Sequence, residues 1–115
     1  MAVKLKRVYL KAAKSDGCRV LVDRLWPRGL SKRKAKVHHW LRDIAPSTRL
    51  RRWYGHDPER WAGFKQRYRA ELKGEKEAVQ GLKALLKKHA TVTFLFSSKQ
   101  EKRNNAAALK AYLRK

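Results

Sequence analysis

Two arginines and an aspartate lie close together in a segment where neither a helix nor a strand can continue. Arg24 and Arg28 flank a short stretch that contains Pro27, and Asp23 comes directly before it. Pro27 has a fixed φ and no N–H, so it stiffens the loop. Two guanidinium groups held in this way can grip a phosphate or carboxylate in a bidentate geometry that lysine cannot match. Asp23 can orient one arginine or accept a proton, and a purely structural Asp–Arg pair is an equally good interpretation.

Three further polar residues are expected at the same rim. Ser47 supplies a hydroxyl, Lys99 an ammonium group and Asn104 an amide. With Asp23 and the two arginines they make a candidate pocket for an anion, such as a small phosphorylated ligand. Each of the three also fits the role of a helix cap or loop residue, so both interpretations stay open.

A second group of cations is predicted to face phosphates over a wider surface. Its members are Lys32, Arg33, Lys34, Lys36, Arg49, Arg51 and Arg52. Such side chains position a protein on nucleic acid but carry no base information, so binding through them tolerates any sequence and weakens with salt. Trp53 stands beside three of these arginines, and an aromatic ring with flanking cations can stack on a base of a single strand.

Cysteine and histidine indicate neither a metal centre nor a nucleophile. Cys18 is the one cysteine and begins a predicted buried strand, where a thiol is unreactive. His38 and His39 are adjacent, so on a strand they point to opposite faces and cannot share a zinc ion. His56 is expected to play a structural role near a helix end. The chain lacks the common phosphate-loop and nucleophile motifs, so we expect no metal and no cofactor and assign no catalytic residue.

The charge balance is the most unusual property of the chain. There are 31 Lys and Arg residues against 9 Asp and Glu, a net charge of +22, which attracts polyanions without any specific contact. The expected polyanion is nucleic acid. A membrane is not expected, because there is no apolar run of about 20 residues and no amphipathic basic helix led by aromatic residues. The single cysteine and the absence of a secretion signal favour the cytoplasm.

The order of predicted elements favours an α/β fold in a single domain over residues 1–115. The expected strands cover residues 3–9, 18–23 and 91–96. The expected helices cover residues 32–36, a segment from 48, a segment from 57 to 74, residues 75–89 and a last helix opened by Asn104 or Asn105. Residues 37–44 fit a strand or a helix equally well. This order predicts a small Rossmann-like sandwich with a mostly parallel central sheet flanked by helices, and a ligand outside the carboxyl ends of its strands.

The chain resembles domain-of-unknown-function family 488, in its short YeaO-like branch. The residues that carry the resemblance are the run 16–29 (DGCRVLVDRLWPRG), Trp40, residues 45–48 (APST), Leu50, Arg51, Trp53, Phe64, Tyr68, Glu71, Leu72, residues 97–99 (SSK) and Asn104. The resemblance covers nearly the whole chain in order. It implies a compact α/β fold with a Rossmann-like sheet, and one shared site formed by the Asp23–Arg28 loop and the Asn104 region. The family has no established activity to carry over.

One position departs from the family pattern. Family members commonly have Asn-His where this chain has Asn104 and Asn105. A general acid or base at the second position would be absent here. The acidic residues usual between the motifs are also largely replaced by Lys and Arg, which fits a nucleic-acid role, an extreme habitat or charge engineering.

Three functional hypotheses follow. The leading one is a strongly basic, largely sequence-nonspecific nucleic-acid-binding module. The second is an enzyme or ligand-binding domain for a small phosphorylated or nucleotide-like molecule at the strand-end loops, and the third is a charge-altered protein that binds polyanions only incidentally. The sequence leaves open whether the chain catalyses a reaction and whether it is a monomer or a homodimer.

Overall fold

The computed structural model describes residues 2–55 and 57–114. The structural role expected for His56 therefore lies outside the described residues.

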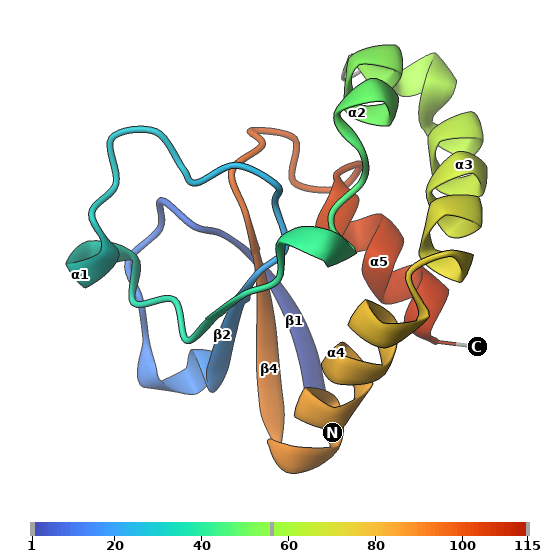
Figure 1. The fold of residues 1–115 in the computed structure, drawn as a ribbon. Coiled ribbons are helices and arrows are strands. Elements are labelled where there is room, and N and C mark those ends of the chain that lie inside the picture. Colours follow the sequence, from blue (N-terminus) through green and yellow to red (C-terminus); the bar gives the residue numbers. More distant parts are fainter. Residues whose placement is uncertain (1, 56, 115) are drawn as a thin grey trace.

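The centre of the fold is a four-stranded sheet in which every pair of neighbours is parallel (Figure 1). Its strands are β1 (Ala2–Arg7), β2 (Cys18–Leu21), β3 (His39–Trp40) and β4 (Thr91–Phe96), in the order β1-β4-β2-β3. The β-branched and aromatic run of β4 has the composition typical of a strand buried on both faces. The α/β class and the parallel central sheet predicted from the sequence are confirmed.

Five helices complete the described part of the chain. They are α1 (Lys32–Ala35), α2 (Thr48–Tyr54), α3 (Trp61–Lys73), α4 (Lys76–Lys88) and α5 (Asn105–Leu113). Side-chain caps begin three of these segments: Ser31, Asp57 and Asn104 each accept a hydrogen bond from a backbone N–H in the turn that follows. The prediction that Asn104 opens the last helix is confirmed. Asp57 opens a short 3₁₀ turn, Pro58–Arg60, that leads into α3. Within the described ranges, no helix has the length and apolar content to cross a membrane.

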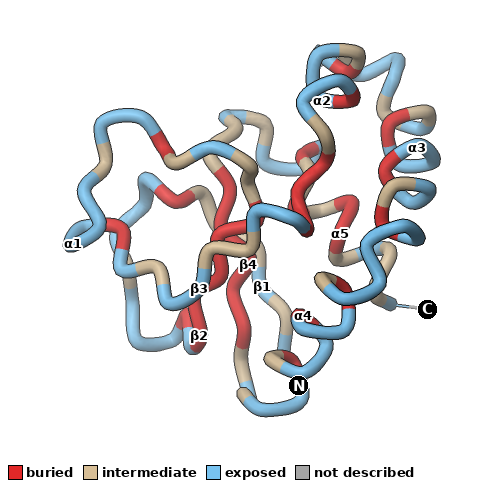
Figure 2. The backbone as a smooth tube through the Cα atoms, in the orientation of Figure 1, coloured by how far each residue is buried: buried red, intermediate tan, exposed pale blue. Residues whose placement is uncertain are grey.

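The two faces of the sheet are covered in different ways. One face packs against α4 and α5, on which α3 packs in turn. The larger core on this side includes Phe64, Tyr68, Leu82 and Phe94. The other face is covered by the segment between β2 and β3, which contains only the one-turn helix α1 (Figures 1 and 2). Helices therefore flank one face of the sandwich, whereas the other is flanked mainly by loop.

Several segments differ from the predicted elements in extent, among them β2, which ends at Leu21 and not at residue 23. Residues 37–44 form the two-residue strand β3 and then a 3₁₀ turn, Arg42–Ile44, so neither interpretation of this stretch describes it completely. The first strand ends at Arg7, two residues earlier than predicted. This early end leaves Tyr9 exposed at the carboxyl edge of the sheet.

A buried ion pair fastens the β2–β3 segment to the sheet. Asp16 and Arg19 are both almost fully buried, and Arg19 Nη1 donates to Asp16 Oδ2 at 2.6 Å. The same guanidinium donates to the backbone carbonyls of Ala35 (2.7 Å) and Lys36 (3.1 Å) at the end of α1. Lys6 adds a second cation, 3.1 Å from the Asp16 carboxylate. Burial alone would raise the pKa of Asp16, but the hydrogen bonds from Ala13, Lys6 and Arg19 lower it below its usual value.

Asp16→Asn should make the free energy of unfolding less dependent on pH in the acid range. The folded-state pKa of Asp16 lies below its unfolded value of about 3.9, so the carboxylate stabilises the fold above that pH, and this contribution is lost as pH falls through the folded pKa. Near neutral pH the variant should lose about 3–5 kcal/mol of unfolding free energy, because Arg19 is left buried without its partner. Urea denaturation at a series of pH values gives curves of unfolding free energy against pH for the wild type and the variant, and the two curves should converge as the pH falls. Parallel curves would contradict this role.

Gly17→Ala should destabilise the fold strongly. Gly17 has φ +64°, and a Cβ at this position would lie 2.2 Å from the Thr91 carbonyl oxygen. Both the left-handed backbone and the backbone clash oppose a side chain, so we expect a loss of about 3 kcal/mol in urea denaturation. The matched control is Gly81→Ala within α4, where nothing lies within 4 Å of the new Cβ. That variant should gain about 0.5–1 kcal/mol from helix propensity.

Candidate functional site at the carboxyl edge of the sheet

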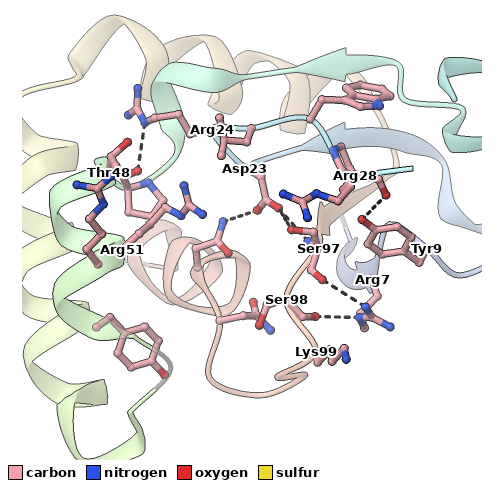
Figure 3. Close-up of a pocket in the computed structure, with 18 of the residues that line it drawn as sticks. Arg7, Tyr9, Asp23, Arg24, Arg28, Thr48, Arg51, Ser97, Ser98 and Lys99 are labelled. Carbon is pink, nitrogen blue, oxygen red and sulfur yellow. Dashed lines mark hydrogen bonds between the residues drawn. The ribbon is translucent and has the colours of Figure 1, made fainter. Parts of the chain in front are cut away.

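A cavity of about 900 Å³ opens where β1, β2 and β4 end together. The strand register brings these ends side by side, because Arg7 pairs with Phe96 and Leu21 pairs with Leu95. The walls of the cavity come from the residues after β1, the 23–28 loop, α2, residues 97–99 and the start of α5 (Figure 3). This is the edge at which parallel α/β sheets bind their ligands.

Asp23 is the hydrogen-bonding centre of this edge. Its Oδ2 accepts from the backbone N–H of Ser97 at 2.9 Å and from the Ser97 hydroxyl at 2.7 Å. Its Oδ1 accepts from the side-chain amide of Asn105 at 3.0 Å. The Asp23 backbone carbonyl accepts from the indole N–H of Trp40 at 2.8 Å. Asp23 therefore joins the end of β2 to the end of β4 and the start of α5, and it forms no ion pair with another described residue.

The two asparagines at the start of α5 have different roles. Asn104 is 2% exposed; its amide donates to the carbonyls of Gln100 and Glu101, and its Oδ1 caps α5 by accepting from Ala107 N–H. Asn105 is half-buried and donates to the Val22 carbonyl and to Asp23. Asn105, an amide without acid–base capacity, therefore contacts Asp23, the one carboxylate among the described residues of the cavity wall.

Two of the arginines in the wall are anchored to backbone carbonyls. Arg24 donates to Ala45 O at 3.0 Å and to Pro46 O at 3.3 Å. Arg7 donates to Ser98 O at 2.9 Å and to Ser97 O at 3.3 Å. Arg24 is thus not paired with Asp23, contrary to the structural Asp–Arg pair considered above. Both guanidinium groups keep their full charge beside the cavity because a carbonyl does not neutralise them.

Four other cations in the wall have no hydrogen-bond or ion-pair partner within residues 2–55 and 57–114. They are Arg28, Arg51, Arg52 and Lys99, and all four are exposed. Arg28 and Lys99 belong to the predicted anion pocket, whereas Arg51 and Arg52 belong to the predicted nucleic-acid surface. The fold therefore brings part of each predicted site to one cavity. A phosphate there can replace water around these groups without breaking an existing contact.

Apolar and aromatic groups complete the wall. Leu25 is 63% exposed and Tyr9 is 42% exposed, and both line the cavity. The Tyr9 hydroxyl donates to the Arg28 carbonyl at 2.9 Å, which fixes the ring beside the loop. Tyr54 lies deeper, stacked on Phe64, and burial raises the pKa of its phenol above the usual value. The cavity thus presents apolar surface next to unpaired positive charge.

Ser47 does not line the cavity, unlike the other pocket candidates. Its hydroxyl donates to Glu71 at 2.6 Å, its N–H donates to the same carboxylate at 2.8 Å, and its Oγ caps α2 by accepting from Leu50 N–H. The neighbouring Thr48 lines the cavity instead. Ser47 therefore positions α2 and makes no contribution to the wall.

The remaining candidates for nucleic-acid contacts lie outside the cavity wall. Lys32, Arg33, Lys34 and Lys36 are exposed on and after α1, which projects on the opposite side of the sheet from α3 (Figure 1). Arg49 is exposed on α2 but does not line the cavity. These cations extend the positive surface beyond the cavity.

Trp53 is partly buried against the core, and two arginines lie over its ring. The Arg67 and Arg60 guanidinium carbons are 3.9 and 5.2 Å from the ring centroid. Its edge also packs on Gly63, where a Cβ would lie 2.8 Å away. These contacts occupy much of the ring that stacking on a base would need.

Several residues of the wall were not among the candidates from sequence. Arg7, Tyr9 and Thr48 are the clearest examples. The carboxyl end of β1 meets the same edge as β2 and β4, so the parallel arrangement of the strands was the signal that could have identified Arg7. The Cys18 thiol is buried, and burial raises its pKa, in agreement with an unreactive role. Nowhere in the described ranges do three His, Cys, Asp or Glu side chains gather as a metal site would require.

Comparisons with known proteins place the chain among relatives of unknown activity. It is 40% identical to the uncharacterized protein YeaO of Escherichia coli over 114 residues, which covers 99% of this chain and 98% of YeaO. It is 41% identical over 107 residues to uncharacterized proteins of Mycobacterium bovis (Mb3100c) and Mycobacterium tuberculosis (Rv3073c), covering 93% of this chain and 89% of each relative. No solved structure matches it. The family model described as "Inactive DUF488-N3 subclade" matches residues 2–115. The chain therefore belongs to the DUF488 family, as its sequence motifs indicate.

Proposed function

We propose that this domain binds nucleic acid without catalysing a reaction, and that the cavity at the carboxyl edge of the sheet takes its phosphates. The observation that carries the proposal is the set of four exposed cations, Arg28, Arg51, Arg52 and Lys99, that line one cavity without partners among the described residues. Arginine presents a planar fork of donors that fits phosphate oxygens in pairs. The net charge of +22 draws a polyanion toward this cavity from any direction.

The apolar part of the wall favours a nucleotide unit over a bare phosphate. Leu25 and Tyr9 are exposed beside the cations, and Trp26 lines the same wall. A base or sugar can cover these side chains while its phosphate contacts Arg28. Stacking and apolar contact of this kind accept every base, so they add affinity without sequence preference.

Three observations favour binding over catalysis. The wall contains no histidine or cysteine among the described residues, Asp23 already accepts three hydrogen bonds, and Asn105 is an amide beside it. The described residues of the wall thus lack the two side-chain types most often used for proton transfer and nucleophilic attack. The matching family model carries the word "inactive" in its own description, which agrees with this interpretation.

A second candidate is a small phosphorylated or nucleotide-like ligand in the same cavity. Its volume of about 900 Å³ favours this candidate because it lies within the range of small-molecule sites. A thermal-melting panel of mononucleotides and inorganic phosphate separates the two. A mononucleotide at about 100 times its Kd would add about 2.7 kcal/mol of stability.

Replacing Arg28, Arg51 and Arg52 with Gln should weaken binding to single-stranded oligonucleotides of any sequence. We expect a loss of about tenfold or more at about 150 mM salt, with the slope of log affinity against log salt reduced by about two to three. Fluorescence anisotropy over a salt series measures both quantities. The loss should be uniform across sequences because phosphates carry no base information.

The matched control replaces three exposed cations of α3 and α4, Arg69, Lys73 and Lys83, with Gln. Both triple variants lose the same charge, so equal losses of affinity would mean that the charge binds polyanions incidentally, and the proposed site would be wrong. Ser47→Ala is a second control. It should lower stability by about 1–2 kcal/mol through the lost cap and Glu71 contacts, yet leave affinity unchanged.

A further inference from the structure

The cavity wall contains a carboxylate, although the other charged side chains of its described residues are cations. Among the described residues of the wall, Asp23 is the only acidic one, whereas six are Arg or Lys. A carboxylate there repels a phosphate, unless the ligand also offers a donor for it. Its neighbours in sequence do not neutralise it, since Arg24 is bound to backbone carbonyls and no ion pair to Arg28 forms.

The hydrogen bonds that Asp23 accepts leave part of its acceptor capacity unused, and Asp23 lines the cavity. A carboxylate can accept at about four positions, and three are taken by Ser97 and Asn105. The side-chain oxygen of Asn105 receives no hydrogen bond from another residue within the described ranges, so a second acceptor lies beside the carboxylate. Asp23 is half-buried, held by donors from two other segments, and lies between Arg24 and Arg28 (Figure 3). The pair forms a fixed acceptor patch among cations.

A ribose hydroxyl has the chemistry that this patch lacks. It donates a hydrogen bond, it is uncharged, and it is joined through its sugar to a phosphate that needs cations nearby. Deoxyribose lacks the 2′-hydroxyl, and this group is what lets a protein distinguish RNA from DNA at one position. We propose that Asp23, supported by Asn105, accepts a hydrogen bond from a 2′-hydroxyl, so that the cavity prefers single-stranded RNA to single-stranded DNA. This inference rests on the nucleic-acid binding proposed above.

The test compares three oligouridylates of about eight nucleotides, a length within the usual footprint of single-strand binders. They carry ribose, deoxyribose or 2′-fluororibose, and the fluoro sugar keeps a ribose-like pucker but cannot donate. At about 150 mM salt the wild-type protein should bind the ribose strand about tenfold more tightly than the other two, as expected for one hydrogen bond to a charged acceptor. A fluoro strand that binds as tightly as the ribose strand overturns the proposal.

Asp23→Asn locates the preference within the chain. Removing one negative charge should raise the affinity for all strands slightly. The quantity to measure is therefore the ratio of the affinity for the ribose strand to the affinity for the deoxyribose strand. This ratio should fall to about one. Asp43→Asn, at an exposed position outside the cavity, makes the same charge change and should keep the ratio of the wild type. An unchanged ratio in Asp23→Asn overturns the proposal. If that variant does not fold, the three strands still decide the matter on the wild-type protein.

The triple variant of Arg28, Arg51 and Arg52 separates failure of this inference from failure of the proposed function. Equal binding of all three strands, weakened in each case by the triple variant, leaves phosphate binding in the cavity intact and removes only the ribose preference. If the triple variant binds all three strands as tightly as the wild type does, nucleic acid does not occupy the cavity. In that case both the proposed function and the role of Asp23 are wrong.

Discussion

The arrangement of the carboxyl edge of this sheet depends on the hydrogen bonds that one half-buried side chain, the Asp23 carboxylate, accepts. Its three side-chain acceptor contacts bind the end of β2 to the first residue after β4 and to the first residue of α5. Those segments are more than seventy positions away in the chain. Hydrogen bonds to a charged acceptor are stronger than neutral ones, so a single side chain can hold three segment ends in register. Arg24, Arg28 and Lys99 of the cavity wall lie close in sequence to these joined ends.

The few acidic residues of the chain explain why so much positive charge is left over. Asp16 is used inside the fold by Arg19 and Lys6, and Asp23 is used by Ser97 and Asn105. Glu71 is used by Ser47 at the start of α2. Acidic side chains with these structural duties are not free to neutralise the surface. In the described part of the chain, none of the cavity cations forms an ion pair. Their positive potential therefore extends into the solvent.

Local sequence patterns predicted most of the elements, because their causes lie within a few residues. Ser31, Asp57 and Asn104 act on N–H groups in the next turn, and the spacing of Phe64, Tyr68 and Leu72 needs only the helical period. The two-residue strand β3 was not predictable in this way, since it exists only through pairing with β2.

The site was predictable in part for the same reason. Asp23, Arg24, Arg28 and Lys99 follow strands whose ends could be read from the sequence. The direction of the Ser47 side chain is decided by Glu71, which comes 24 positions later, and the environment of Trp53 is decided by Arg60 and Arg67 of other segments. No local pattern carries that information. Arg51 and Arg52 joined the cavity only because α2 packs beside the 23–28 loop.

The uneven covering of the sheet divides the molecule into parts of different local stability. The segment between β2 and β3 contributes only Ala35 as a fully buried apolar residue after Pro27, and it is fastened mainly by Arg19 and by the indoles of Trp26 and Trp40. A segment with few buried contacts can open by itself while the helical side stays folded. Amide exchange should then be fast along α1 and slow in β4. The exposed lysines of α1 would thus move relative to the sheet while the strands at both ends of their segment stay paired.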